Sequence, residues 1–151
     1  MMSKTHFAFG LLVGLFFSGI FGIEDKLLFV SVCVLSSLLP DIDLPMSKIG
    51  SKVRPLSWLI NLFFGHRGLI HTVFIPLIIW GILSYYGWNL IAASFFLGYM
   101  SHLIIDMLNT KGITFFYPLS KVRVNGFIKA GGMLEWLLFL AIVFGIILIL
   151  V

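Results

Sequence analysis

We interpret the sequence as that of an all-α membrane protein, with about five transmembrane helices plus a short interfacial helix. Hydrophobic residues make up 60% of the 151 positions and charged residues only 11%, and the mean hydropathy is +1.13. So few polar residues cannot cover a soluble surface. The length fits roughly five crossings in one integral membrane domain that covers residues 1–151.

The first two predicted spans are joined by a short polar turn. Span one covers about residues 6–23, residues 24–26 form the turn, and span two covers about 27–39 and is stopped by Pro40. A cleaved signal peptide is the competing interpretation of the first 23 residues. A retained helix is favoured, because the apolar stretch is long and no A-x-A site follows it.

The second half of the chain supplies the interfacial helix and three more spans. Residues 56–64 predict a helix that lies along the membrane surface and is anchored by Trp58. Spans three, four and five cover about residues 68–86, 89–108 and 133–151. Tyr85, Tyr86 and Trp88 are typical of an aromatic belt at the far end of span three.

The basic residues predict the orientation of these spans. With alternating crossings, nine of the ten Lys and Arg residues lie on the side of the N-terminus, and only Lys26 lies opposite. The nine are Lys4, Lys48, Lys52, Arg54, Arg67, Lys111, Lys121, Arg123 and Lys129. The positive-inside rule then places the N-terminus in the cytoplasm and the protein in the inner membrane.

The same crossings bring eight candidate metal ligands to the cytoplasmic side. They are His6, His66, His71, His102, Asp41, Asp43, Asp106 and Glu135. His102 lies about 20 Å along span four, and therefore roughly 10 Å below the cytoplasmic edge of the hydrocarbon core. Ionisable groups at such a depth are costly and are usually functional. A shared divalent ion neutralises several of them together.

The residue types favour particular ions. His and carboxylate ligands without Cys suit Zn, Mn or Fe better than Mg, and Cys33 is the only cysteine. Eight candidates exceed the needs of one zinc ion, so we expect one or two divalent ions. Simpler interpretations stay open for single residues: a turn at Asp41 and Asp43, a satisfied buried His102, and a helix cap at Glu135.

Five motifs resemble a known family. They are HFAFG at 6–10, LLPDID at 38–43, GHRGLIHT at 65–72, GYMSHLIIDMLNTKGI at 98–113 and AGGMLE at 130–135. In order and spacing they resemble the YdjM-like family of membrane-bound, predicted metal-dependent hydrolases, also labelled LexA-binding. The resemblance implies a polar pattern at His6, Asp41, Asp43, His66, Arg67, His71, His102, Asp106 and Thr110, with Glu135 at a weaker position. Thr72 and Val73 depart from a pattern in which Ser is common.

Together these observations predict a metal-dependent phosphoesterase that acts on a membrane lipid or lipid-linked phosphate, with no nucleic-acid partner. The expected metal ligands are His6, Asp41, Asp43, His66, His71, His102 and Asp106. Asp43 or Glu135 would act as general base, and Arg67 would hold the phosphate. Two alternatives remain: a metal transporter, and a membrane anchor with a structural metal whose basic loops bind a soluble partner.

Overall fold

The computed structural model describes residues 1–43, 58 and 69–151, and this part of the chain is helical, as predicted. The elements are α1 (Ser3–Ile20), α2 (Lys26–Leu38), the 3₁₀ helices η1 (Leu39–Asp43) and η3 (Leu69–His71), α4 (Phe74–Tyr85), α5 (Asn89–Met107) and α6 (Met133–Leu150). The described residues form two isolated β-bridges and no extended strand. The class is therefore an all-α membrane protein.

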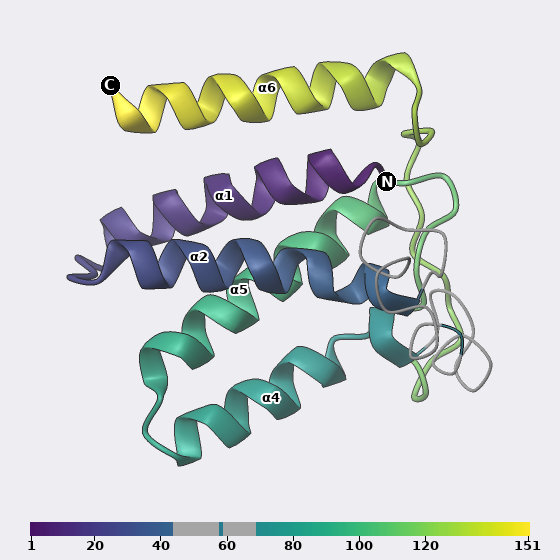
Figure 1. Ribbon diagram of the computed structural model, residues 1–151. Coiled ribbons are helices and arrows are strands. Elements are labelled where there is room, and N and C mark those ends of the chain that lie inside the picture. Colours follow the sequence, from purple (N-terminus) through teal and green to yellow (C-terminus); the bar gives the residue numbers. More distant parts are fainter. Residues whose placement is uncertain (44–57, 59–68) are drawn as a thin grey trace.

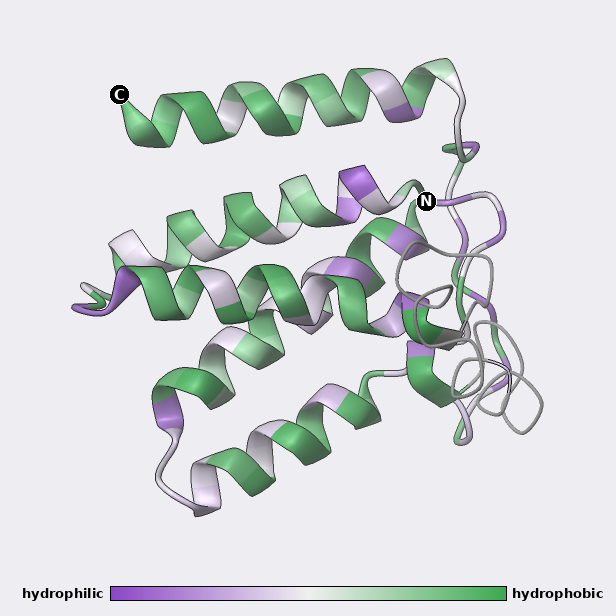
Figure 2. Ribbon diagram, viewed as in Figure 1, coloured by the Kyte–Doolittle hydropathy of each residue, from purple (hydrophilic) through white to green (hydrophobic). Residues whose placement is uncertain are grey.

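Helix α5 is the centre of the bundle (Figure 1). It packs against α1, α2 and α4, whereas α6 packs chiefly on α1. The N-terminus, η1, η3, the end of α5 and the start of α6 all lie at one end of the bundle (Figure 1), which we call the site end. Figure 2 shows hydrophobic residues along the helices and hydrophilic positions mostly at their ends.

Small residues let α1, α2 and α5 approach closely. A Cβ added to Gly98 of α5 would overlap the Cys33 carbonyl and the Ser36 hydroxyl of α2. A Cβ added to Gly10 of α1 would overlap the Ser37 hydroxyl. Close approach of this kind is the usual means of helix association in a membrane. It brings the side chains at the site end within contact of one another.

The predicted spans agree with the helices in order and position, but not all of them reach full length. Helices α1, α5 and α6 are long and apolar enough to cross a membrane. Helices α2 and α4 have 13 and 12 residues, and at 1.5 Å per residue they reach only about 18–20 Å. The predicted interfacial helix 56–64 lies outside the described residues except for Trp58, which is helical and exposed.

The third predicted span begins later than residue 68. A 3₁₀ turn ends at His71, and α4 begins at Phe74. Pro76 explains the break, because proline is tolerated in the first turn of a helix but not further inside it. The Thr72 hydroxyl donates to the Leu69 carbonyl at 2.8 Å, and the Val73 N–H donates to the Phe115 carbonyl at 3.0 Å. His71 is thereby held at the site end.

The segment between α5 and α6 lies across the site end (Figure 1). Backbone bridges join Asn109 to Ile128 and Ile113 to Val124. Gly112 has a φ of +56°, and an added Cβ there would overlap the Val124 carbonyl. The segment is therefore a hydrogen-bonded structure that is tied to the end of α5, where the Ile128 N–H donates to the Leu108 carbonyl at 2.9 Å.

Candidate metal centre

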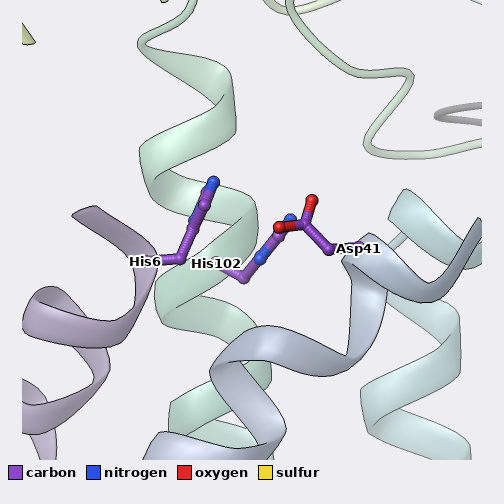
Figure 3. A group of neighbouring side chains, drawn as sticks. All are labelled: His6, Asp41 and His102. Carbon is purple, nitrogen blue, oxygen red and sulfur yellow. The ribbon is translucent and has the colours of Figure 1, made fainter. Parts of the chain in front are cut away.

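Five of the predicted ligands meet at the site end. His6 comes from the second turn of α1, Asp41 from η1, His71 from η3, and His102 and Asp106 from successive turns of α5. The three histidines are 0% exposed, Asp106 is 1% exposed and Asp41 is 9% exposed. Figure 3 shows His6, Asp41 and His102 converging from three elements. The structure brings these five residues together, and their role as metal ligands stays a prediction.

Asp106 lies at the centre of the histidines. Its Oδ1 is 3.5 Å from His6 Nε2, and its Oδ2 is 3.7 Å from His71 Nε2 and 3.9 Å from His102 Nε2. The amino group of Met1 also contacts Oδ1, at 2.8 Å. The imidazole separations exceed a charge-assisted hydrogen bond, which is about 2.7–2.9 Å long. They are close to the separation of about 3.3–3.5 Å between two ligands of a tetrahedral zinc ion.

The proton position on His102 follows from its backbone contact. His102 Nδ1 lies 2.8 Å from the Ser37 carbonyl oxygen. Because a carbonyl only accepts, Nδ1 carries the proton and Nε2 of the neutral ring keeps its lone pair. Nε2 is buried and has no hydrogen-bond partner among the described residues. Histidines that bind metals almost always donate their other N–H in this way.

His6 stacks on His102. The ring centroids are 3.8 Å apart and the planes are inclined by 14°. Neither ring nitrogen of His6 has a hydrogen-bond partner in the described part of the chain. Two positive rings in such a stack would repel each other. A neutral imidazole offers such a ring nitrogen to a metal ion.

The five side chains form two overlapping groups. One contains His6, Asp41 and His102, and the other contains His71, His102 and Asp106, with one ligand atom from each residue within 4.8 Å of the others. His102 belongs to both groups but offers a single free nitrogen, Nε2, so it can bind only one ion at a time. Three imidazoles and two carboxylates without sulfur fit a divalent Zn, Mn or Fe ion.

The remaining predicted residues are not part of either group. Of Asp43 only the backbone, in η1, is described, and His66 and Arg67 lie outside the described residues. Their assignments as ligands, base and phosphate-binding group stay predictions. The structure therefore places five of the seven expected metal ligands.

Glu135 is buried at the start of α6 and joins this helix to α1. One oxygen, Oε1, accepts from the Met2 N–H at 2.6 Å and from the Thr5 hydroxyl at 3.0 Å. The other accepts from the Gly131 N–H at 2.6 Å. Glu135 is 0% exposed and belongs to neither ligand group. These contacts position the turn of α1 that carries His6, and the predicted catalytic role stays untested.

Three residues that lie around the cluster are not predicted from the sequence. Ser37 acts through its main-chain carbonyl, which no side-chain pattern reveals. Thr5 is 0% exposed and bonds Glu135. Asn109 is 1% exposed and follows His102 and Asp106 at the spacing i, i+4, i+7, which places all three on one side of a helix. That spacing is the signal that could have identified Asn109.

The fold and the site together define a multi-pass helical membrane protein with a buried cluster of histidines and carboxylates at one end. The chain belongs to the YdjM inner membrane protein family, whose sequence model matches residues 1–151. This agrees with the family resemblance of the motifs. The class and the family are therefore consistent.

Relatives of the chain occur in several bacteria. The chain is 34% identical to YvsG of Bacillus subtilis (strain 168) over 139 residues, which are 91% of this chain and 86% of that protein. It is 35% identical over 98 residues to the inner membrane protein YdjM of Escherichia coli (strain K12) and to that of Shigella flexneri. These 98 residues are 59% of this chain and 48% of each relative. No solved structure matches the chain.

Proposed function

We propose that the chain is a metal-dependent hydrolase that cleaves phosphoesters of a lipid or lipid-linked substrate at the cytoplasmic face of the membrane. One observation carries the metal part of this proposal. Three buried imidazoles have Nε2 within 3.5–3.9 Å of one carboxylate, and the Nδ1 of His102 is fixed by a main-chain carbonyl. Metal-binding histidines have this arrangement, in which one ring nitrogen faces the metal and the other donates a hydrogen bond that orients the ring.

The cost of burial supports a bound cation. A carboxylate deep in the membrane is costly unless it is paired, and unpaired imidazole nitrogens add to that cost. Asp106 is 1% exposed and is contacted by the Met1 amino group at 2.8 Å. Both ring nitrogens of His6 and Nε2 of His102 lack hydrogen-bond partners among the described residues. A divalent ion, Zn or Mn rather than Mg, would satisfy these groups together.

The residues divide into three roles under this proposal. His6, Asp41, His71, His102 and Asp106 would hold the metal, joined by Asp43 and His66 if a second ion binds. When bound, such an ion lowers the pKa of a coordinated water and withdraws charge from a phosphoryl oxygen. Asp43 or Glu135 would accept the proton of the attacking water. Arg67 would hold the phosphate through its planar guanidinium.

The position of the cluster favours a lipid substrate. His102 lies below the expected level of the headgroups, at the end of an apolar bundle whose outer surfaces face lipid. The basic residues of the 109–132 segment, Lys111, Lys121, Arg123 and Lys129, are all exposed and suit an anionic headgroup. Their excess on this side also supports the cytoplasmic placement of the site.

The test uses purified full-length protein in detergent. We expect elemental analysis to find one or two Zn or Mn ions per chain, and we expect release of phosphate or of a headgroup from at least one member of a phospholipid panel. His102→Ala should abolish turnover while the helices remain inserted. Loaded metal without turnover on any phospholipid would contradict the enzymatic proposal. Joint loss of stability and partner binding in His102→Ala would instead support a structural metal.

A further inference from the structure

Asn109 holds a buried polar group that the proposed roles leave unexplained. The residue is 1% exposed, and its side-chain Nδ2 has no hydrogen-bond partner among the described residues. A buried amide donor without a partner costs free energy. Such a group calls for an acceptor that comes from outside the described part of the chain.

The orientation of this amide is fixed by its neighbours. The Lys111 N–H donates to Asn109 Oδ1 at 2.9 Å. Because a main-chain N–H only donates, the atom beside it must be the oxygen, and Nδ2 is the end that remains available. The Asn109 carbonyl accepts from the N–H groups of Gly112 and Gly126, at 2.9 and 3.1 Å. The donor is therefore presented by a rigid turn.

The turn places Asn109 next to the metal cluster along the chain. Its N–H donates to the Asp106 carbonyl at 3.2 Å, and the intervening Leu108 keeps right-handed helical angles. Asn109 therefore lies two residues beyond the end of α5 and three residues beyond Asp106, at the site end. The donor is thus carried by the turn that directly follows the helix end with the central carboxylate.

We propose that the Asn109 amide donates a hydrogen bond to an oxyanion of the phosphate class bound at the metal centre. The inference rests on the proposed function and deepens it, since it assigns a recognition residue for the phosphoryl group. A donor aimed at an oxyanion makes a charge-assisted hydrogen bond, which is shorter and stronger than a neutral one. The acceptor is either a free phosphate or a lipid headgroup, because both present the same oxygens.

Two substitutions at Asn109 remove the amide donor but keep an oxygen that can accept from the Lys111 N–H, so the turn is retained. Asn109→Ser keeps an oxygen that accepts from the Lys111 N–H and removes the amide donor. Asn109→Asp keeps the shape and replaces the donor by a charged acceptor. Asn125→Asp is the matched control, because Asn125 is exposed in the same segment and receives the same change of charge.

The experiment titrates Mn²⁺-loaded, full-length protein with inorganic phosphate in one arm and with short-chain phosphatidic acid below its micellar concentration in the other. Calorimetry gives the affinity, and broadening of the ³¹P resonance shows that the phosphorus lies near Mn²⁺. We expect Asn109→Ser to weaken binding about 10-fold and Asn109→Asp to weaken it more. Asn125→Asp should bind like the unaltered protein, and the arm with the tighter binding identifies the source of the phosphate.

The outcomes distinguish this inference from the proposed function. Equal phosphate affinity in the unaltered protein and Asn109→Ser overturns the inference, and so does a lack of phosphate binding in both arms. Failure to bind Mn²⁺ or Zn²⁺ overturns the proposed function instead. In that case, titration of the metal-free protein with phosphate shows whether the Asn109 amide binds the oxyanion without a metal, and equal affinity in Asn109→Ser overturns that as well.

Discussion

The two ends of the bundle differ in whether their buried polar side chains find hydrogen-bond partners. In the far half, the buried hydroxyls of Ser18 and Ser94 donate to carbonyls of their own helices, at 2.9 and 3.1 Å. The exposed Asp25 there caps α2 by accepting from the Leu28 N–H. At the site end, both ring nitrogens of His6 have no hydrogen-bond partner in the described residues. Buried polar side chains in this bundle can form hydrogen bonds within their own helices. Imidazole nitrogens that lack such bonds at one end therefore indicate a binding site there.

This difference also bears on the transporter alternative. An ion path needs polar groups that continue across the midplane toward the far side. Among the described residues, the buried polar side chains of the far half are Ser18 and Ser94, and both are bonded within their own helices. A cluster confined to one end of the bundle is compatible with an enzyme or with a structural metal centre.

The largest expected effect comes from removing the central carboxylate. Asp106→Asn keeps the shape but removes the charge that three imidazoles face. We expect the affinity for Zn²⁺ or Mn²⁺ to fall more than about 100-fold, because loss of an outer-shell partner alone costs 10- to 100-fold. Competition with a chelator of known affinity measures the change.

The matched control is Asp25→Asn, which makes the same change at an exposed carboxylate in the far turn. It should leave metal affinity unchanged. Equal affinity in Asp106→Asn and the unaltered protein would exclude a metal centre at this position.

A smaller effect is expected from Glu135→Gln. Both oxygens of Glu135 accept hydrogen bonds, from Met2, Thr5 and Gly131. In Gln the NH₂ group would replace one of these oxygens and would face an N–H or O–H donor, so at least one hydrogen bond would be lost. The first turns of α1 should then shift and move His6. We expect metal affinity to fall about 10-fold, with a changed absorption spectrum of bound Co²⁺.

Glu24→Gln serves as the control, since Glu24 is exposed in the turn between α1 and α2. A spectrum of Co²⁺-loaded Glu135→Gln that matches the unaltered protein would show that Glu135 does not position the ligands. The base role predicted from the sequence would then become the better explanation of a buried carboxylate there.

The sequence predicts the site end better than it predicts the details within it. Apolar run lengths and alternate crossings suffice to bring His6, Asp41, His71, His102 and Asp106 to one face, because helix geometry fixes depth. The late start of α4 depends on Pro76 and on a main-chain bond from Val73 to Phe115, which is far away in the sequence. The roles of Ser37 and Glu135 depend on contacts between helices, which hydropathy does not contain.

The packing of the bundle gives a third test, by comparing two helical glycines. Gly98→Ala places a Cβ against the backbone of α2, whereas Gly81 in α4 has nothing within 4 Å of an added Cβ. We expect Gly98→Ala to lower the free energy of unfolding by about 1–3 kcal/mol. Gly81→Ala should be neutral or slightly stabilising.

Unfolding in mixed micelles with increasing SDS, followed by circular dichroism, measures both glycine variants. If Gly98→Ala were as stable as Gly81→Ala, α2 and α5 could not be as close as the structure places them. The convergence of η1 and α5 at the ligands would then need another explanation.

The smallest effect is expected in the far half of the bundle. Ser94→Ala removes a hydroxyl that bonds to the Ile91 carbonyl of its own helix. We expect the free energy of unfolding to change by about 0.6 kcal/mol or less, which is the mean contribution of a hydrogen bond between membrane helices. Metal affinity should stay the same, because no ligand depends on Ser94. A lower metal affinity in Ser94→Ala, or metal uptake into liposomes that this variant blocks, would connect the far half to the ligands. The contrast between the two ends would then fail, and a path across the membrane would become the better interpretation.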